Sequence, residues 1–247
     1  MRVGMTILYN GRHTVEACIR NTLRFCDRVV VIYGRVEALS GMPPDGSLGI
    51  VERMARAEKR IKLINPGKVW SEKLEMVRQA EPEFEDGWLI QVDCDEFYHP
   101  IEMDRVIVAA ERLERKDIEF YAHHFFGSVR TVVPMVDGRP GNLIPWRRCF
   151  RVMPGDRWLS HQPPRIEGPD RSILTRDITA DLGVFLYHYG YVWRSQCEEK
   201  IVLHGQRGDQ IGDYDRASIG ELIPMGKDCH LIPFDGNHPV DVNEFRE

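Results

Sequence analysis

The chain has 247 residues, with 33 basic and 38 acidic side chains for a formal net charge of −5. Hydrophobic residues make up 43% and charged residues 29%, which is typical of a globular protein and not of a disordered one. No apolar run approaches the ~20 residues of a membrane-spanning helix, no signal peptide is visible, and the net charge argues against general coating of nucleic acid. We expect one cytoplasmic unit over residues 1–247.

The cysteines show no paired spacing of the kind found in zinc ribbons or small disulfide scaffolds. They stand at Cys18, Cys26, Cys94, Cys149, Cys197 and Cys229. Isolated cysteines in a chain of this size are typical of small buried hydrophobic side chains in a reducing compartment.

Strands and helices alternate in the first hundred residues. Apolar or β-branched runs predict strands at Met5–Tyr9, Arg28–Tyr33, Ile61–Ile64 and Trp88–Val92. Apolar residues at helical spacing predict helices from Thr14 to about Cys26, from Ser47 through Ala57 and over Ser71–Ala80. The order β-α-β-α-β-α-β implies right-handed crossovers and an open, mostly parallel, Rossmann-like sheet.

The remainder of the chain has a different texture. A long amphipathic helix is expected at about Met103–Arg115, and a further helix near Ser195–His204. Strands are expected at Ile118–Phe126, Val129–Val136, Arg148–Val152 and Gly183–His188. Because turn residues separate these strands, we expect hairpins added to the sheet edge. The predicted fold class is therefore α/β, a three-layer α/β/α arrangement of a mostly parallel sheet with added antiparallel strands.

Charge is distributed unevenly over the second half of the chain. Residues 130–176 contain nine arginines, no lysine and four acids, whereas residues 177–247 contain thirteen acids and six bases. Arginine favours planar, bidentate contacts with phosphate or carboxylate groups. The arginine-rich segment therefore indicates either an anion-binding region or surface hairpins whose arginines are solvated.

The sharpest local feature is the sequence Gln91-Val92-Asp93-Cys94-Asp95-Glu96-Phe97. An apolar strand runs directly into two carboxylates one residue apart, and residues i and i+2 of a strand face the same side. Ligands of open α/β sheets bind beyond the carboxyl ends of the strands. Two hard oxygen ligands there suit Mg²⁺ or Mn²⁺ holding a diphosphate, the alternative being solvated loop acids.

This pair is one of five motifs that follow one another along the chain between residue 3 and about residue 205. They are Ile7-Leu8-Tyr9-Asn10, Asp45-Gly46-Ser47, Trp70 with Lys73, Asp93-Cys94-Asp95, and Tyr187-His188-Tyr189-Gly190-Tyr191-Val192 followed by Lys200. With these motifs the sequence resembles the GT-A glycosyltransferases, specifically the family 2-like bacterial and phage enzymes. The resemblance implies a GT-A fold, with a nucleotide-sugar-binding half at residues 1–100 and an acceptor-side half with a C-terminal tail at residues 101–247.

The resemblance also implies a function and a set of site residues. The function is metal-dependent, inverting transfer of a sugar from a nucleotide-sugar donor, expected to be a UDP-sugar, to an acceptor hydroxyl. The implied donor-binding residues are Tyr9, Asn10, Asp45, Trp70, Lys73 and Asp93. The implied ligands of Mn²⁺ or Mg²⁺ are Asp93, Asp95 and His188, with His188 packed among tyrosines as the alternative. The neighbouring pair His123-His124 faces opposite sides of a strand, which favours structural roles.

An inverting transfer also needs a base that deprotonates the acceptor hydroxyl. The segment from Trp158 to Gly168 offers His161 and Glu167, ahead of Asp156 and Asp170. Trp146, Trp158 and Trp193 are either sugar-stacking or core residues.

Two other functions and several acceptors stay open. The same fold could activate a sugar phosphate as a nucleotidyltransferase, although Asn10-Gly11-Arg12-His13 is a poor version of the required Gly-rich loop. The chain could also be a non-catalytic nucleotide- or sugar-binding module. Expected acceptors are a glycan, a lipid-linked glycan or a modified DNA base.

Overall fold

The computed structural model describes residues 1–247 except 40, 85, 134, 137–138, 141–144, 162–163, 169, 194, 197–230 and 246–247. The helices are α1 (Val15–Thr22), α2 (Ser47–Ala57), α3 (Lys73–Ala80), α4 (Pro100–Arg112) and α5 (Arg176–Asp181). The strands of the first half are β1 (Arg2–Leu8), β2 (Arg28–Tyr33), β3 (Ile61–Ile64), β4 (Gly87–Gln91), β5 (Glu96–Phe97), β6 (Asp117–Phe120) and β7 (Ala122–Phe126). Those that follow are β8 (Thr131–Val132), β9 (Met135–Val136), β10 (Arg139–Pro140), β11 (Trp146–Val152), β12 (Arg157–His161), β13 (Pro164–Glu167), β14 (Ile173–Leu174), β15 (Leu186–Tyr191) and β16 (Ile232–Pro233).

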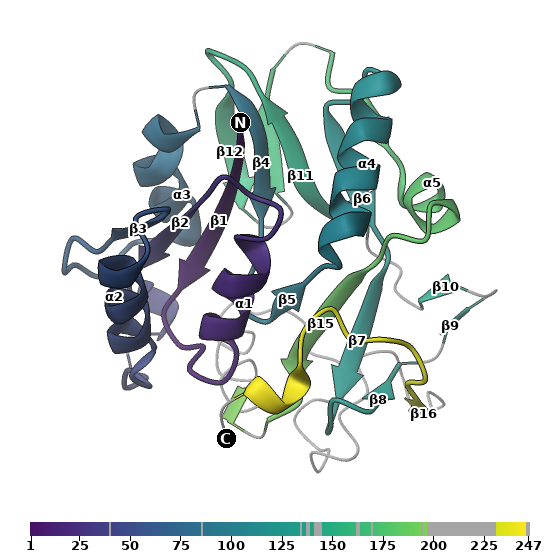
Figure 1. Ribbon diagram of the computed structural model, residues 1–247. Helices are drawn as coiled ribbons and strands as arrows, with labels where there is room; N and C mark the ends of the chain where they lie inside the picture. Colours follow the sequence, from purple (N-terminus) through teal and green to yellow (C-terminus); the bar gives the residue numbers. More distant parts are fainter. Residues whose placement is uncertain are drawn as a thin grey trace.

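A seven-stranded sheet in the order β14-β6-β11-β4-β1-β2-β3 forms the centre of the fold (Figure 1). Strands β1 to β4 are mutually parallel, which confirms the mostly parallel α/β sheet predicted from the alternation of elements. Strand β11 is antiparallel to both β4 and β6. The prediction that the added strands lie at the sheet edge is therefore wrong for β11, which lies between β4 and β6 inside the sheet.

A second sheet, in the order β16-β8-β7-β15-β5, lies beside the first (Figure 1). The strand expected over Ile118–Phe126 is divided at Tyr121 between the two sheets, with β6 in one and β7 in the other. The carbonyl of Tyr121 accepts a hydrogen bond from the amide of Leu186, 3.0 Å away, at the start of β15. One continuous apolar run therefore joins the sheets, which strand periodicity alone does not reveal.

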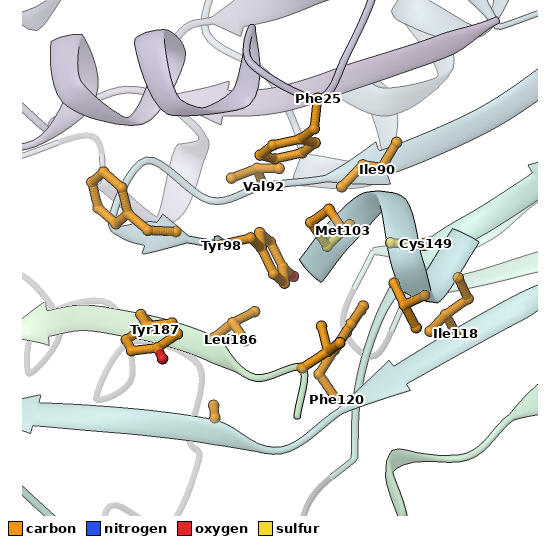
Figure 2. Close-up of a cluster of buried hydrophobic side chains, with 14 of the residues drawn as sticks. Phe25, Ile90, Val92, Tyr98, Met103, Ile118, Phe120, Cys149, Leu186 and Tyr187 are labelled. Carbon is orange, nitrogen blue, oxygen red and sulfur yellow. The ribbon is translucent and has the colours of Figure 1, made fainter. Parts of the chain in front are cut away.

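Alternating side chains of β2 show why helices cover both faces of the central sheet. Val29 and Val31 pack in a cluster with α1 and α2, whereas Val30 and Ile32 pack with α3 on the opposite face. Helix α4 covers the part of the sheet formed by β4, β11 and β6, where Met103, Ile118 and neighbouring side chains form a buried cluster (Figure 2). These contacts confirm the expected three layers, helices on each side of a central sheet.

Two local differences from the predicted elements affect the site. Strand β15 begins at Leu186, three residues later than the expected strand at Gly183, because Gly183 takes a left-handed turn conformation (φ +72°) after α5. The segment that contains the candidate bases His161 and Glu167 forms the antiparallel hairpin of β12 and β13, which packs beside α3. Most of the helix expected near Ser195–His204, with Lys200 of the late motif, lies outside the described residues.

The described cysteines are free thiols. Cys18, Cys26 and Cys149 are buried and Cys94 is half-buried, as expected of small hydrophobic side chains. Cys197 and Cys229 lie outside the described residues. In the part of the chain that the structure describes, no helix is both long enough and apolar enough to cross a bilayer.

Candidate active site

A cavity of about 750 Å³ opens where the first and fourth strands end. Its walls come from the loops after β1, β2 and β4, and from β11 and β15; Asn10, Asp93 and His188 are among the lining residues. Strands β1 and β4 are neighbours from which the strand order runs in opposite directions, β2 on one side and β11 on the other. The cavity therefore lies at the topological switch point, where open α/β sheets bind their ligands.

The carboxylates after β4 are held by a buried arginine. Arg148 is 6% exposed, and its Nε donates to both carboxylate oxygens of Glu96 at 2.9 and 3.1 Å. Its Nη2 donates to Glu96 Oε1 at 2.6 Å and to Asp93 Oδ2 at 3.3 Å. The amide of Asp93 in turn donates to Glu96 Oε2 at 3.1 Å. Glu96 and Arg148 thus fix the backbone and the side chain of Asp93 together.

A β-bulge brings Arg148 to this position. In the pairing of β11 with β6, Arg147 lies opposite Glu119 and Cys149 lies opposite Ile118, so Arg148 is an extra residue without a partner of its own. A bulge redirects side chains relative to the regular alternation of a strand. Arg148 consequently faces the cavity and the carboxylates after β4.

The ionisation of these acids follows from burial and from the neighbouring positive charges. Burial raises the pKa of Asp93, but Arg148, His161 and Lys73 outweigh it and hold that pKa below its ordinary value. Burial raises the pKa of Glu96 to about 7 although Arg148 opposes the shift. Asp93 is therefore a carboxylate at neutral pH.

Two histidines stand on the other side of Asp95. His188 Nε2 lies 3.6 Å from Asp95 Oδ2, and the Nδ1 atoms of His124 and His188 are 2.9 Å apart, so one of the two rings donates to the other. His123 points away from this pair and packs against Tyr187 and other aromatic rings, where burial lowers its pKa to about 4. The opposite orientation of His123 and His124 agrees with the strand alternation.

The loops after β1 and β2 are tied together by Asp45. Its Oδ2 accepts from the amides of Gly11 at 2.7 Å and Arg12 at 2.8 Å, and its Oδ1 accepts from the amide of Ser47 at 2.9 Å. Tyr9 donates through its hydroxyl to the carbonyl of Met42 at 2.6 Å. Asp45 and Tyr9 therefore build the wall of the cavity through loop contacts.

Lys73 and Asn10 line the same cavity. Lys73 is the first residue of α3, and the side-chain oxygen of Asn10 accepts from the amide of Asp45 at 3.2 Å. Five of the six residues expected to bind the donor thus share one cavity: Tyr9, Asn10, Asp45, Lys73 and Asp93.

The sixth, Trp70, does not reach the cavity. It is fully buried in the core on the α3 side, and its indole nitrogen donates to the carbonyl of Tyr33 at 3.3 Å. A Cβ atom at Gly34 would collide with that nitrogen, so Gly34 leaves the space that Trp70 fills. Trp70 supports the loop after β2 and has no position from which to contact a donor in the cavity.

The structure places the two candidate general bases, His161 and Glu167, in different environments. His161 lines the cavity at the end of β12, with its Nε2 atom 3.3 Å from the side-chain nitrogen of Gln91. Glu167 does not line the cavity: it is exposed at the end of β13 and pairs with Arg157 at 3.0 Å. In the β12–β13 hairpin Glu167 lies opposite Arg157 and is exposed.

The remaining candidates divide in the same way. Trp146 lines the cavity, whereas Trp158 is buried against Phe150, with ring centroids 5.2 Å apart. Trp193 stacks on His13 with centroids 4.8 Å apart. Asp156 forms an ion pair with Arg171 at 2.8 Å, and Asp170 occupies a turn with positive φ.

Arg148 and Glu96 are the site residues that the sequence patterns do not single out. The arginine-only segment points to anion contacts without separating Arg148 from its neighbours, because the separation depends on the bulge. Glu96 directly follows the two aspartates and is visible as a third acid, but only the fold shows that it is fully buried against an arginine.

No group of three side chains that could hold a metal ion gathers among the described residues. Asp93 and Asp95 nonetheless line the cavity together with His188. Two carboxylates and an imidazole are a donor set that suits Mn²⁺, and the two carboxylates alone suit Mg²⁺.

No protein-family model matches the chain, and no curated protein matches its sequence. Among solved structures, TarS of S. aureus is 12% identical with a TM-score of 0.43, over 61% of this chain and 28% of the TarS chain. A shorter form of TarS, residues 1–349 in complex with UDP-GlcNAc, is similar over 45% of its length. The mannosyltransferase PcManGT from Pyrobaculum calidifontis, in complex with GDP-Man and Mn²⁺, is 13% identical with a TM-score of 0.40, over 48% of this chain and 34% of its own. The chain thus spans less than half the length of each of these proteins.

Proposed function

We propose that this protein is a GT-A-type, family 2-like glycosyltransferase that transfers a sugar from a nucleotide-sugar to an acceptor hydroxyl. One observation carries the proposal: Asp93 and Asp95 share a switch-point cavity with the cations of Lys73 and Arg148. Such a site matches the needs of a diphosphate, which requires positive charge on its oxygens and hard oxygen ligands for a bridging metal. The order of the sequence motifs supports the same function.

Asp93, Asp95 and His188 would hold the metal, Mn²⁺ or Mg²⁺. When bound, the metal supplies Lewis-acid stabilisation of the departing diphosphate. The Arg148 pair with Asp93 Oδ2 involves only one of the two carboxylate oxygens of Asp93, so the other oxygen can be a ligand. The low pKa of Asp93 keeps that ligand ionised at neutral pH.

The nucleoside would lie along the apolar part of the cavity. Val36, Leu39 and Met42 from the loop after β2, and Met76 from α3, line that side together with Tyr9. Apolar walls with a few fixed polar groups are typical of small-ligand sites. A uridine base is the expected occupant, by resemblance to the family 2-like enzymes.

His161 is the base that the geometry favours over Glu167. A general base must lie within hydrogen-bonding reach of the acceptor hydroxyl, and His161 lines the cavity while Glu167 is ion-paired outside it. The acceptor hydroxyl would lose its proton to His161 as its oxygen attacks the anomeric carbon from the face opposite the diphosphate. The anomeric configuration is then inverted.

The test is a donor screen with the full chain. Nucleoside diphosphate release is measured with UDP-, GDP-, ADP-, CDP- and dTDP-sugars in Mn²⁺, Mg²⁺ or EDTA, with and without glycan, lipid-linked glycan and DNA acceptors containing modified bases. We expect release with one nucleotide class, loss in EDTA, and a fall of about 100-fold or more in D93A and D95A. D86A is the matched control, because Asp86 is exposed and pairs with Arg151. Full activity of folded D93A, or no binding of any nucleotide, would refute the proposal.

A further inference from the structure

The guanidinium of Arg148 has one edge in use and one edge available. Nε and Nη2 form the edge that holds Glu96 and Asp93, through four hydrogen bonds of 2.6 to 3.3 Å. The two N–H groups of Nη1 donate to no acceptor in the described parts of the chain, although the Arg148 side chain is only 8% exposed. An arginine that is nine-tenths buried beside a cavity with an unused pair of donors indicates a ligand acceptor.

We propose that the Nη1 edge of Arg148 binds the terminal phosphate of a nucleoside diphosphate. The inference deepens the proposed function and rests on it. Arginine meets phosphate oxygens with charge-assisted hydrogen bonds, which are stronger than those between neutral groups. Arg148 is then a phosphate-binding residue, and Glu96 is a positioning residue that holds its guanidinium.

Charge around the cavity supports a phosphate at this point. Arg12 and Lys73 line the same cavity, so three permanent cations face the volume that Asp45, Asp93 and Asp95 also line. Each oxygen of Asp45 accepts a backbone amide. Arg148 and Lys73 are the permanent cations whose charge lowers the pKa of Asp93. The Trp146 ring, 4.6 Å from the guanidinium carbon, fixes the plane of Arg148 from a further side.

The Arg148 side chain is held in one conformation, which makes it suitable for binding phosphate. The side chain starts at a bulge in a central strand and is held by a fully buried carboxylate, so little rotamer entropy is lost when a phosphate binds. Lys73, at the start of α3, lacks a comparable fork geometry. The ligand class that we infer is a nucleoside diphosphate and not a monophosphate, because Arg148 bonds Asp93, beside which the proposed metal and diphosphate would lie.

The test compares di- and monophosphate binding in the full chain without metal. Isothermal titration in EDTA measures the dissociation constants of UDP, GDP, ADP, CDP and dTDP and of their monophosphates. The main variant is the double R148M/E96Q, in which the side-chain amide oxygen introduced by E96Q keeps an acceptor for the Asp93 amide, and the fully buried residue 96 carries no unpaired charge. Asp93 loses Arg148 in this variant but keeps the charge of Lys73 nearby. R157M/E167Q is the matched control, because this exposed pair receives the same two substitutions.

We expect the favoured diphosphate to lose about tenfold or more in affinity in R148M/E96Q, as a charge-assisted hydrogen bond is removed. The monophosphate should change by less than about twofold, and the control should match the wild type for both ligands. R148K, which keeps the charge without the fork, should fall between them and provides the same comparison if the double variant fails to fold.

Manganese binding separates phosphate binding from support of Asp93. If Arg148 merely positions Asp93, Mn²⁺ affinity measured by electron paramagnetic resonance falls, while the ratio of diphosphate to monophosphate affinity in EDTA stays at its wild-type value. That result would overturn the inference. A wild-type protein that binds no nucleoside diphosphate at all would instead overturn the proposed function itself, and with it this role of Arg148.

Discussion

Arg147 and Arg148 are neighbours in the chain but belong to two different ion-pair networks. Arg147 lies at the β6 side of the sheet, where its guanidinium bonds Glu119 at 2.8 Å and Asp117 at 3.4 Å. Asp117 also accepts a hydrogen bond from Arg171, which forms a second ion pair with Asp156. Each charged group of this network is therefore paired with another side chain of the protein. Arg148 bonds Glu96 and Asp93 through Nε and Nη2, and its side chain lines the cavity. The Arg147 network is thus closed within the protein, whereas the Arg148 network borders the cavity in which we propose that a diphosphate binds.

The largest expected difference between the two networks is in stability. R148M alone leaves Glu96 fully buried without its partner, which should cost about 3 kcal/mol of unfolding free energy. R147M should cost only about 1 kcal/mol, because Asp117 keeps Arg171 and the Arg147 side chain is 29% exposed. Urea unfolding of both variants measures the contrast, and equal losses would show that the networks do not differ in this way.

The next effect concerns the tight wall of the cavity. A Cβ at Gly11 would lie 2.6 Å from the Cys94 sulfur and 2.9 Å from a Leu8 methyl carbon, so G11A must displace the residue between Asp93 and Asp95. We expect a loss of ~1–3 kcal/mol in stability and a fall in activity larger than the unfolded fraction explains. G49A is the control, because Gly49 lies in α2 with only a contact at 3.8 Å, and alanine there should stabilise by ~0.5–1 kcal/mol. Unchanged activity of G11A would mean that Cys94 and Leu8 can move aside without displacing Asp93 and Asp95, which would contradict a tightly packed cavity wall.

A smaller effect is expected at His123, which is half-buried away from the cavity and contributes to stability alone. The pKa of His123 is lowered to about 4 by burial among aromatic rings, whereas its unfolded value is about 6.5. The unfolded chain therefore binds more protons between those values, so this contribution is complete above about pH 6.5 and is lost as the pH falls toward about 4. The loss amounts to about 1–2 kcal/mol after allowance for partial exposure. Chemical unfolding across that range should show a weaker pH dependence in H123Q, and an identical slope would contradict the assignment.

The smallest expected effect is at Glu167. E167Q removes an ion pair whose partners are 74% and 54% exposed, so stability should change by less than ~0.5 kcal/mol. Activity should also stay within about twofold of the wild type, whereas H161Q should lower kcat by ~100-fold or more. A large loss of kcat in E167Q with normal stability would contradict the choice of His161 and indicate that Glu167 is the general base.

Local patterns in the sequence predict the first half of the fold. β2, α2 and β3 end where the residue patterns place them, because each is a regular element bounded by turn residues. The apolar pattern of Arg148–Val152 predicts the greater part of β11, but its place between β4 and β6 depends on pairing between distant segments. Such pairing has no local sequence pattern.

The candidate site is predictable where a motif coincides with a strand end. Asp93 and Asp95 follow closely after β4, which ends at Gln91, and their convergence on a cavity requires only the parallel sheet. Trp70 shares a motif with Lys73 but is a core residue, because Gly34 leaves a space that an indole fills. Arg148 cannot be distinguished from its neighbour Arg147 by sequence, since a one-residue bulge decides which of the two faces the cavity.

The most direct test of the proposed site is a crystal structure of the protein grown with Mn²⁺ and the nucleoside diphosphate that it binds most tightly. Anomalous scattering measured at the manganese edge locates the metal independently of the refined coordinates. We predict a single strong peak coordinated by Asp93 and Asp95, with the terminal phosphate against Nη1 of Arg148. A peak away from both aspartates, or a diphosphate bound with its terminal phosphate away from Arg148, would contradict this arrangement.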